Sequence, residues 1–137
     1  MSLFKVLDIA GSGMSAQALR LNTTASNLAN AESVSSSSGE TYRARQPVFA
    51  AMVKALGESP AGTGVQVNGI VESQAPLRQQ YEPGHPMANE EGYIFLPNVS
   101  MVEEMANMIS ASRSYQSNSE VAKTSKELLM RTLSLGQ

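Results

Sequence analysis

Apolar residues recur at helical spacing near the start of the chain. They follow one another at intervals of three and four residues, which places them on one face of an α-helix as a heptad seam. The seam positions are Phe4, Leu7, Gly11, Met14, Ala18, Leu21, Ala25 and Leu28. Ser2 is a suitable N-cap, and the Asn- and Ser-rich residues 30–38 predict the exit into a loop.

A second and longer helix is predicted at the other end of the chain. Ser100 and Glu103 have the spacing of a capping box, and neither Pro nor Gly occurs between Ser100 and Leu135. About 36 residues of helix span ~54 Å. Its predicted seam is Met101, Met105, Met108, Ser112, Tyr115, Ser119, Ala122, Lys126, Leu129 and Leu133. Three polar positions dilute this seam, and Gly136 is expected to end the helix.

The middle of the chain has the composition of strands and turns. All six Pro and seven of the ten Gly lie between Gly39 and Pro97. Extended runs are predicted at 42–53, where Pro47 indicates an edge strand, at 65–67, 70–71 and 93–96. Asn68-Gly69 predicts a turn. We therefore divide the chain into an N-terminal helix (1–32), a loop with a small β-rich or irregular middle segment (33–97) and a C-terminal helix (98–137).

The expected fold class is mainly α. Two long terminal helices form a coiled-coil-like pair, antiparallel or slanted, with a small β-hairpin or short β-region between them. Their unequal lengths leave part of the longer seam without a partner inside the subunit. An unpaired apolar seam needs another subunit, a membrane or disorder, and repeating one contact builds a ring or a tube.

Charge and composition narrow the class of partner. The chain carries 10 basic and 12 acidic residues without a basic stripe, so we expect no nucleic acid partner. Cysteine is absent, which excludes disulfides and thiolate chemistry. Lys5 and Asp8 break the pattern of a secretory signal, and no apolar run approaches ~20 residues.

The candidate chemical groups favour structural roles. His85 stands alone between Gly84 and Pro86, so we expect a loop residue and no metal site. Gly11-Ser12-Gly13 lies inside a helical seam, which favours close helix packing over phosphate binding. Glu103 and Glu104 diverge on a helix and complement its dipole. We therefore predict no enzyme, no cofactor and no small-molecule substrate.

The Asn residues of the first helix leave two interpretations open. Asn22, Asn27 and Asn30 are mediocre helix formers. They either mark fraying of the helix end or form interhelical hydrogen bonds that set register between subunits. We favour the second interpretation, because all three lie in residues 21–31, a stretch that resembles a motif of a known protein family.

Four stretches of the chain carry motifs that resemble those of known proteins. The first, residues 21–31 (LNTTASNLANA), resembles the signature of flagellar rod and hook proteins. Two others, EPGHP at 82–86 with GY at 92–93 and LPNV at 96–99, and VEEMANMISASRSYQSN at 102–118, resemble more narrowly the FlgC type of the proximal rod. The final TLSLG at 132–136 is typical of axial proteins.

The resemblance implies a structural subunit of a hollow rod that transmits torque. It implies export through the flagellar type III apparatus without a cleaved signal and assembly in the periplasm. Expected partners are further copies of the chain, other flagellar rod proteins, and the adaptor joining the rod to the export gate and membrane ring. Another short flagellar axial protein and a soluble coiled-coil adaptor remain alternatives. The predicted assembly interface comprises Leu7, Met14, Leu21, Asn22, Asn27, Leu28, Asn30, Met105, Met108, Ile109, Tyr115, Leu129 and Leu133.

Overall fold

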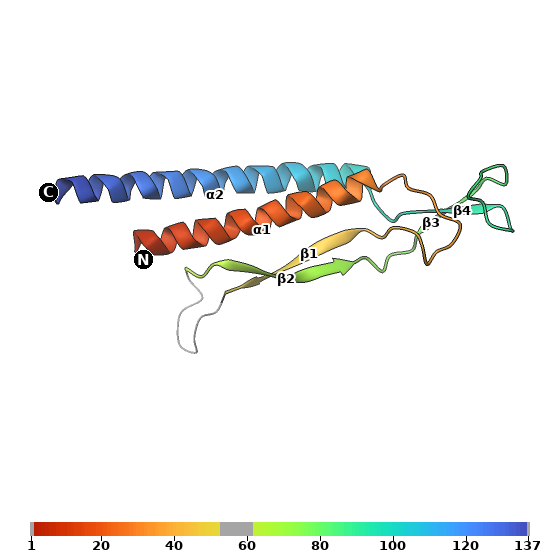
Figure 1. The fold of residues 1–137 in the computed structure, drawn as a ribbon, viewed down its shortest axis with the longest axis horizontal. Helices are drawn as coiled ribbons and strands as arrows, with labels where there is room; N and C mark the ends of the chain where they lie inside the picture. The colour runs from red at the N-terminus through yellow and green to blue at the C-terminus, as the bar shows by residue number, and fades with distance from the viewer. Residues whose placement is uncertain (1, 53–61, 137) are drawn as a thin grey trace.

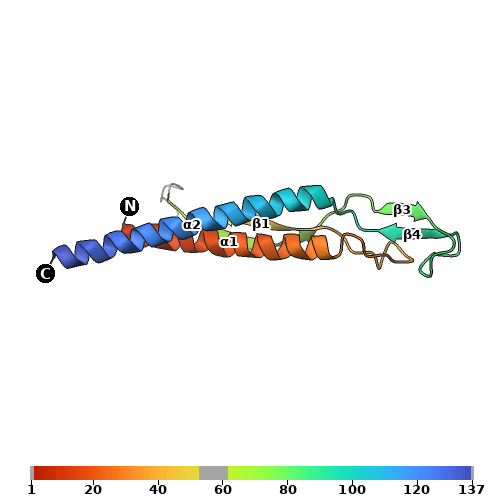
Figure 2. The ribbon, with the colours of Figure 1, turned by 90° about the horizontal axis from the view of Figure 1, so that it is seen from above.

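Two helices run side by side along most of the molecule, and short strands extend from one end of the pair. This computed structural model describes residues 2–52 and 62–136. The elements are α1 (Leu3–Ala29), β1 (Arg45–Ala51), β2 (Val65–Glu72), β3 (Arg78–Tyr81), β4 (Tyr93–Leu96) and α2 (Met101–Leu135). The helices are antiparallel, and the C-terminal end of α2 projects beyond the start of α1 (Figures 1 and 2). The predicted two helices with a small β-region are confirmed.

Both helices begin at the serines that the sequence indicates. The Ser2 hydroxyl accepts a hydrogen bond from the Lys5 N–H at 3.2 Å, and the Ser100 hydroxyl accepts one from the Glu103 N–H at 3.4 Å. Each bond satisfies one of the amide donors that a helix start leaves unpaired. At the other end of α2, the Gly136 N–H bonds to the Leu133 carbonyl at 3.3 Å. The residues at these three helix ends therefore determine where the helices begin and where α2 ends.

The contact between α1 and α2 uses small and polar residues and includes only part of the predicted seam of α2, of which Met108, Ser112, Ala122 and Leu129 are half-buried. The buried residues of α2 are Glu104, Ala111 and Ser125, whereas Met101 and Met105 of the predicted seam are exposed. A Cβ added to Gly13 would lie 2.9 Å from Nδ2 of Asn118, so the helices meet closely there. Close approach requires small side chains, and most of the larger apolar residues of α2 are left exposed.

Strands β1 and β2 form an antiparallel pair that lies along α1. Asn68-Gly69 does not form the predicted turn, because β2 continues through both residues. Val48 pairs with Gly69 and Phe49 with Val67, so Asn68 is the extra residue of a β-bulge. Gly69 has a φ of 155°, a backbone conformation that side chains disfavour. The same Asn-Gly pair that favours a turn thus accommodates a bulge.

Strands β3 and β4 form a second antiparallel pair at the far end of the molecule (Figure 2). Their connecting residues, 82–92, form a loop that we call the tip. Gly92 has a φ of 82°, and a Cβ there would lie 2.9 Å from the Tyr81 ring. The small buried cluster of Ala31, Ala44 and Val99, with Tyr42 against it, lies where the helices meet the strands. Apart from this joint, residues 2–52 and 62–136 contain little apolar core.

Two further expectations from the sequence concern an extended segment and membrane-spanning helices. The predicted extended segment 42–53 contains β1, but Val53 lies outside the described residues. Among the described residues, neither helix is both long and apolar enough to cross a membrane.

Candidate assembly surfaces

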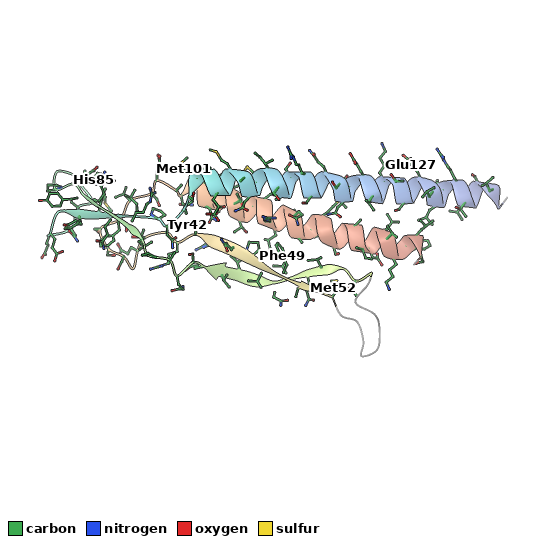
Figure 3. The ribbon with its side chains drawn as sticks, turned by 180° about the vertical axis from the view of Figure 1, so that it is seen from behind. Tyr42, Phe49, Met52, His85, Met101 and Glu127 are labelled. Carbon is green, nitrogen blue, oxygen red and sulfur yellow. The ribbon has the colours of Figure 1, made fainter. Side chains whose placement is uncertain are left out.

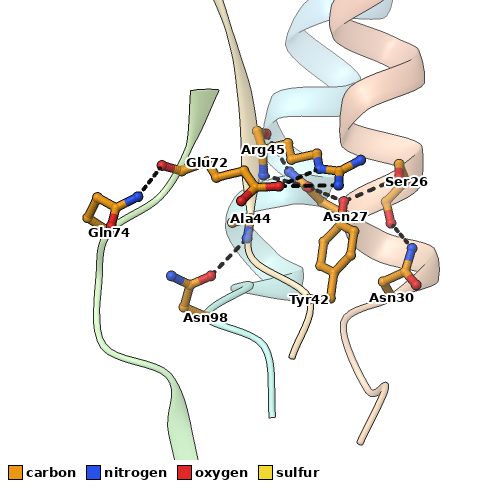
Figure 4. A network of polar contacts seen from close by, with 9 residues as sticks. All are labelled: Ser26, Asn27, Asn30, Tyr42, Ala44, Arg45, Glu72, Gln74 and Asn98. Atoms are coloured by element: carbon orange, nitrogen blue, oxygen red, sulfur yellow. Dashed lines mark hydrogen bonds and ion pairs between the residues drawn. The ribbon is translucent and has the colours of Figure 1, made fainter. Parts of the chain in front are cut away.

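Asn27 fastens the hairpin of β1 and β2 to α1. Its side chain is buried, its Nδ2 donates to the Arg45 carbonyl at 2.8 Å, and its Oδ1 accepts from the Arg45 N–H at 2.9 Å. The Tyr42 hydroxyl donates a further bond to Oδ1 at 2.8 Å (Figure 4). Its carboxamide therefore has three partners within the chain. In this structure Asn27 sets register between α1 and β1, which is not the intersubunit role expected of it.

The contact with Asn27 also occupies hydrogen-bonding groups at the outer edge of β1, the edge that does not pair with β2. The Ala44 carbonyl accepts from the Ser73 N–H at 2.8 Å, so the polar groups of Arg45 point away from β2. Pro47, two residues further on, faces the same way and has no N–H to offer. Asn27 and Pro47 together leave the outer edge of β1 poorly suited to pairing with another strand.

Ser12 holds the other end of the hairpin. Its hydroxyl accepts from the Val65 N–H at 3.0 Å and donates to the Ile9 carbonyl of its own helix at 2.7 Å. A Cβ on Gly64 would lie 2.7 Å from this hydroxyl, so a larger residue would obstruct the contact. The close helix packing predicted for the Gly11-Ser12-Gly13 segment is confirmed at Gly13, whereas Ser12 contacts β2 and a Cβ added to Gly11 would meet nothing within 4 Å.

A polar network surrounds the joint between the helices and the strands. The Arg45 guanidinium forms an ion pair with Glu72 at 3.2 Å and lies 5.4 Å from the centre of the Tyr42 ring. Asn98 accepts from the Ala44 N–H at 2.8 Å and donates to the Ala75 carbonyl at 2.9 Å. These bonds give the strands a defined direction relative to the helices.

Helix α2 leaves many large apolar side chains exposed, interspersed with charged ones. Figure 3 shows side chains along the face of α2 that points away from α1, with Met101 near its start. The exposed large apolar residues of α2 are Met101, Val102, Met105, Ile109, Tyr115, Val121, Leu128, Met130, Leu133 and Leu135. A helix with this distribution presents a surface suited to burial by other protein.

The predicted interface residues divide by their burial. Asn27 is buried; Leu7, Met14, Leu21, Leu28, Asn30, Met108 and Leu129 are half-buried; Asn22, Met105, Ile109, Tyr115 and Leu133 are exposed. The role of the half-buried and exposed residues between subunits stays a prediction. Sequence reasoning missed Val121, Leu128 and Leu135, although their strict spacing of seven residues was available as a signal.

The candidate chemical groups have structural partners. His85 accepts at Nδ1 from the Met87 N–H at 3.0 Å, which holds the tip loop. Glu103 is exposed whereas Glu104 is buried, as expected of adjacent helical positions. No group of three or more potential metal-ligating residues occurs within residues 2–52 and 62–136.

Comparisons with known proteins agree with this architecture of two terminal helices. A family model described as "Flagella basal body rod protein" matches residues 7–34, which cover most of α1. A second, "Flagellar basal body rod FlgEFG protein C-terminal", matches residues 90–135, which include β4 and α2. Both matches fall on the helical ends and define the chain as a flagellar basal-body rod protein.

Whole-chain relatives identify the family within that class. The chain is 52% identical over 137 residues to the flagellar basal-body rod protein FlgC of Escherichia coli O157:H7 and to that of Salmonella typhimurium, with 100% of each chain covered. It is 35% identical over 151 residues to FlgC of Borreliella burgdorferi, covering 100% of this chain and 99% of that one. The chain belongs to the FlgC family, a structural component of the basal-body rod.

Proposed function

We propose that this chain is a subunit of the proximal part of a hollow flagellar rod and assembles through its terminal helices. The observation that carries the proposal is the exposed apolar side chains on the face of α2 turned away from α1, where Val102 is 80% exposed and Ile109 56% exposed. Burying such side chains against neighbouring helices contributes roughly 1.5–3 kcal/mol each. Coiled-coil-like contacts between subunits would bury this face.

Further copies of the chain, other rod proteins, and the adaptor joining rod to export gate and membrane ring are the proposed partners. The names of the relatives support a place in the basal body. The small apolar cluster at the joint supports a subunit that depends on partners, because few large apolar side chains are buried in the part of the chain that the structure describes. We further propose type III export without a cleaved signal and assembly in the periplasm.

A substitution on the outward face tests the proposal. Ile109→Glu should leave the stability of the isolated subunit within about 0.5 kcal/mol, because the side chain is already exposed. In a strain carrying it as the sole copy, the subunit should be missing from washed hook–basal bodies by mass spectrometry, and swimming should stop. Ser110→Glu adds the same charge at an exposed polar neighbour in the same turn, and serves as the matched control.

The outcomes of this experiment distinguish a rod subunit from a soluble coiled-coil adaptor. Loss of incorporation with Ile109→Glu alone supports rod assembly through this face. Normal swimming and normal incorporation of Ile109→Glu would contradict it. Absence of even the unsubstituted chain from washed hook–basal bodies would instead favour the soluble coiled-coil adaptor.

A further inference from the structure

We propose that Asn68 of the folded chain is a site of spontaneous deamidation, in which the backbone nitrogen of Gly69 displaces the side-chain amide with assistance from Gln66. The product is an aspartate or an isoaspartate within β2. Asn68-Gly69 is the one Asn-Gly pair in the sequence. The reaction needs only the chain and water, so it does not depend on the proposed rod function.

The reaction begins when the Gly69 N–H loses its proton to hydroxide. The nitrogen then forms a bond to Cγ of Asn68, and negative charge collects on Oδ1. The Cγ–Nδ2 bond breaks as Nδ2 takes a proton from water and leaves as ammonia, which regenerates hydroxide and produces a cyclic succinimide. Water then adds to either ring carbonyl and gives aspartate or isoaspartate. Because both reacting groups belong to neighbouring residues, no bimolecular encounter precedes the attack.

The β-bulge gives the backbone at Asn68 the freedom that ring closure requires. Asn68 is the extra residue of β2 where the pairing register shifts between Val48 and Phe49, so it has no partner residue on β1. Among the described strands, β1 is the one that pairs with β2, so a second strand does not hold the bulge from the other side. The hydrogen-bonded ladder therefore restrains β2 least at this point.

Gly69 leaves the approach of its own nitrogen unobstructed. It has no side chain, and a Cβ added there would meet nothing within 4 Å. Asn68 and Gly69 are both exposed, so hydroxide and water reach the reacting atoms. Asn22 is also exposed, but it precedes the β-branched Thr23 inside α1, where the helix fixes the backbone.

Gln66 supplies a hydrogen-bond donor to the oxygen on which the charge develops. Its Nε2 donates to Oδ1 of Asn68 at 3.2 Å. A donor at this oxygen draws electron density from Cγ and stabilises the oxyanion that forms as Gly69 attacks. Because Gln66 is exposed, this bond competes with water and its contribution is smaller than in a closed active site.

Deamidation changes both the charge and the backbone of the hairpin. A carboxylate at residue 68 adds one negative charge to a chain whose formal net charge is −2. Isoaspartate also inserts the side-chain methylene into the backbone of β2. Ion-exchange chromatography therefore separates the products from the unmodified chain, and peptide mass spectrometry locates the change.

Incubation of the purified full chain at mildly alkaline pH tests the site. Asn68 should convert to the acid about tenfold faster than Asn22, and the rate should rise with pH because Gly69 must lose a proton. Asn68→Gln should remove the signal, because its longer side chain closes the ring less readily. If Asn68 reacts no faster than Asn22 in the native chain, the proposal is overturned; a fast reaction confined to urea would also overturn it, because the hairpin would then protect the site.

The variant Gln66→Ala tests the assisting donor. It should slow deamidation of the native chain about two- to fivefold, the effect of one exposed hydrogen bond, and should have little effect in urea. Gln74→Ala is the matched control, because Gln74 is exposed and its Nε2 donates to the Glu72 carbonyl at 3.3 Å. Equal rates of the two variants in the native chain would contradict the role given to Gln66.

Discussion

The carboxamide of Asn27 pairs with both backbone polar groups of Arg45, at 2.8 Å and 2.9 Å, as a neighbouring strand would. One side chain of α1 therefore completes the hydrogen bonding at the start of β1 and fixes where the hairpin lies on the helix. Asn27 belongs to residues 21–31, the stretch that resembles other flagellar rod and hook proteins. Its position gives that resemblance a physical basis within the subunit.

Replacing Asn27 with Ala should lower the free energy of unfolding by about 2–4 kcal/mol. The substitution leaves the Arg45 N–H and C=O without their partners, and each unsatisfied buried group costs about 1–3 kcal/mol. Urea unfolding of the purified subunit measures the change. Asn22→Ala, at an exposed position of the same helix, is the control and should stay within about 0.5 kcal/mol. Equal stabilities of the two variants would contradict the role given to Asn27.

The two glycines of α1 should respond differently to alanine. Gly11→Ala should raise the free energy of unfolding by about 1 kcal/mol, because Ala favours helix and nothing lies within 4 Å of the added carbon. Gly13→Ala should gain less or destabilise, because its Cβ would lie 2.9 Å from Nδ2 of Asn118.

The background variant Asn118→Ala tests the cause of that difference. With the obstructing amide removed, Gly13→Ala should approach the gain expected for Gly11→Ala. Thermal unfolding of the four variants provides the comparison. A deficit of Gly13→Ala that persists in the Asn118→Ala background would show that another contact limits this position.

Hydrogen exchange should distinguish the two halves of α2 in the isolated subunit. The amides of residues 129–135 should exchange faster than those around Ala111, because the end of α2 projects beyond α1 whereas Ala111 is fully buried. Both terminal regions should become protected when the subunit enters an assembly. Slow exchange along both complete helices of the monomer would contradict a subunit that needs partners.

Local sequence signals predicted the elements that depend on local physics. The serine caps, the helix limits and β4 follow from capping chemistry, spacing and composition, and the structure confirms them. The turn at Asn68-Gly69 was wrong, because pairing with β1 turns that flexible dipeptide into a bulge. Dipeptide preference alone cannot distinguish the two, since both use the same backbone freedom of Gly69.

The amino-acid sequence by itself determined that two long helices enclose a short β-region, and it indicated the family through its terminal motifs. Only the tertiary structure decided which face of α2 is buried. The periodicity of the sequence indicates which face of a helix is most hydrophobic. Helix α1 approaches α2 closely at Gly13, however, where large side chains would not fit. The small and polar positions Glu104, Ala111 and Ser125 are therefore buried, while most large apolar residues of α2 are exposed and only Met108 and Leu129 are half-buried. That inversion leaves the apolar surface of α2 available for contacts between subunits.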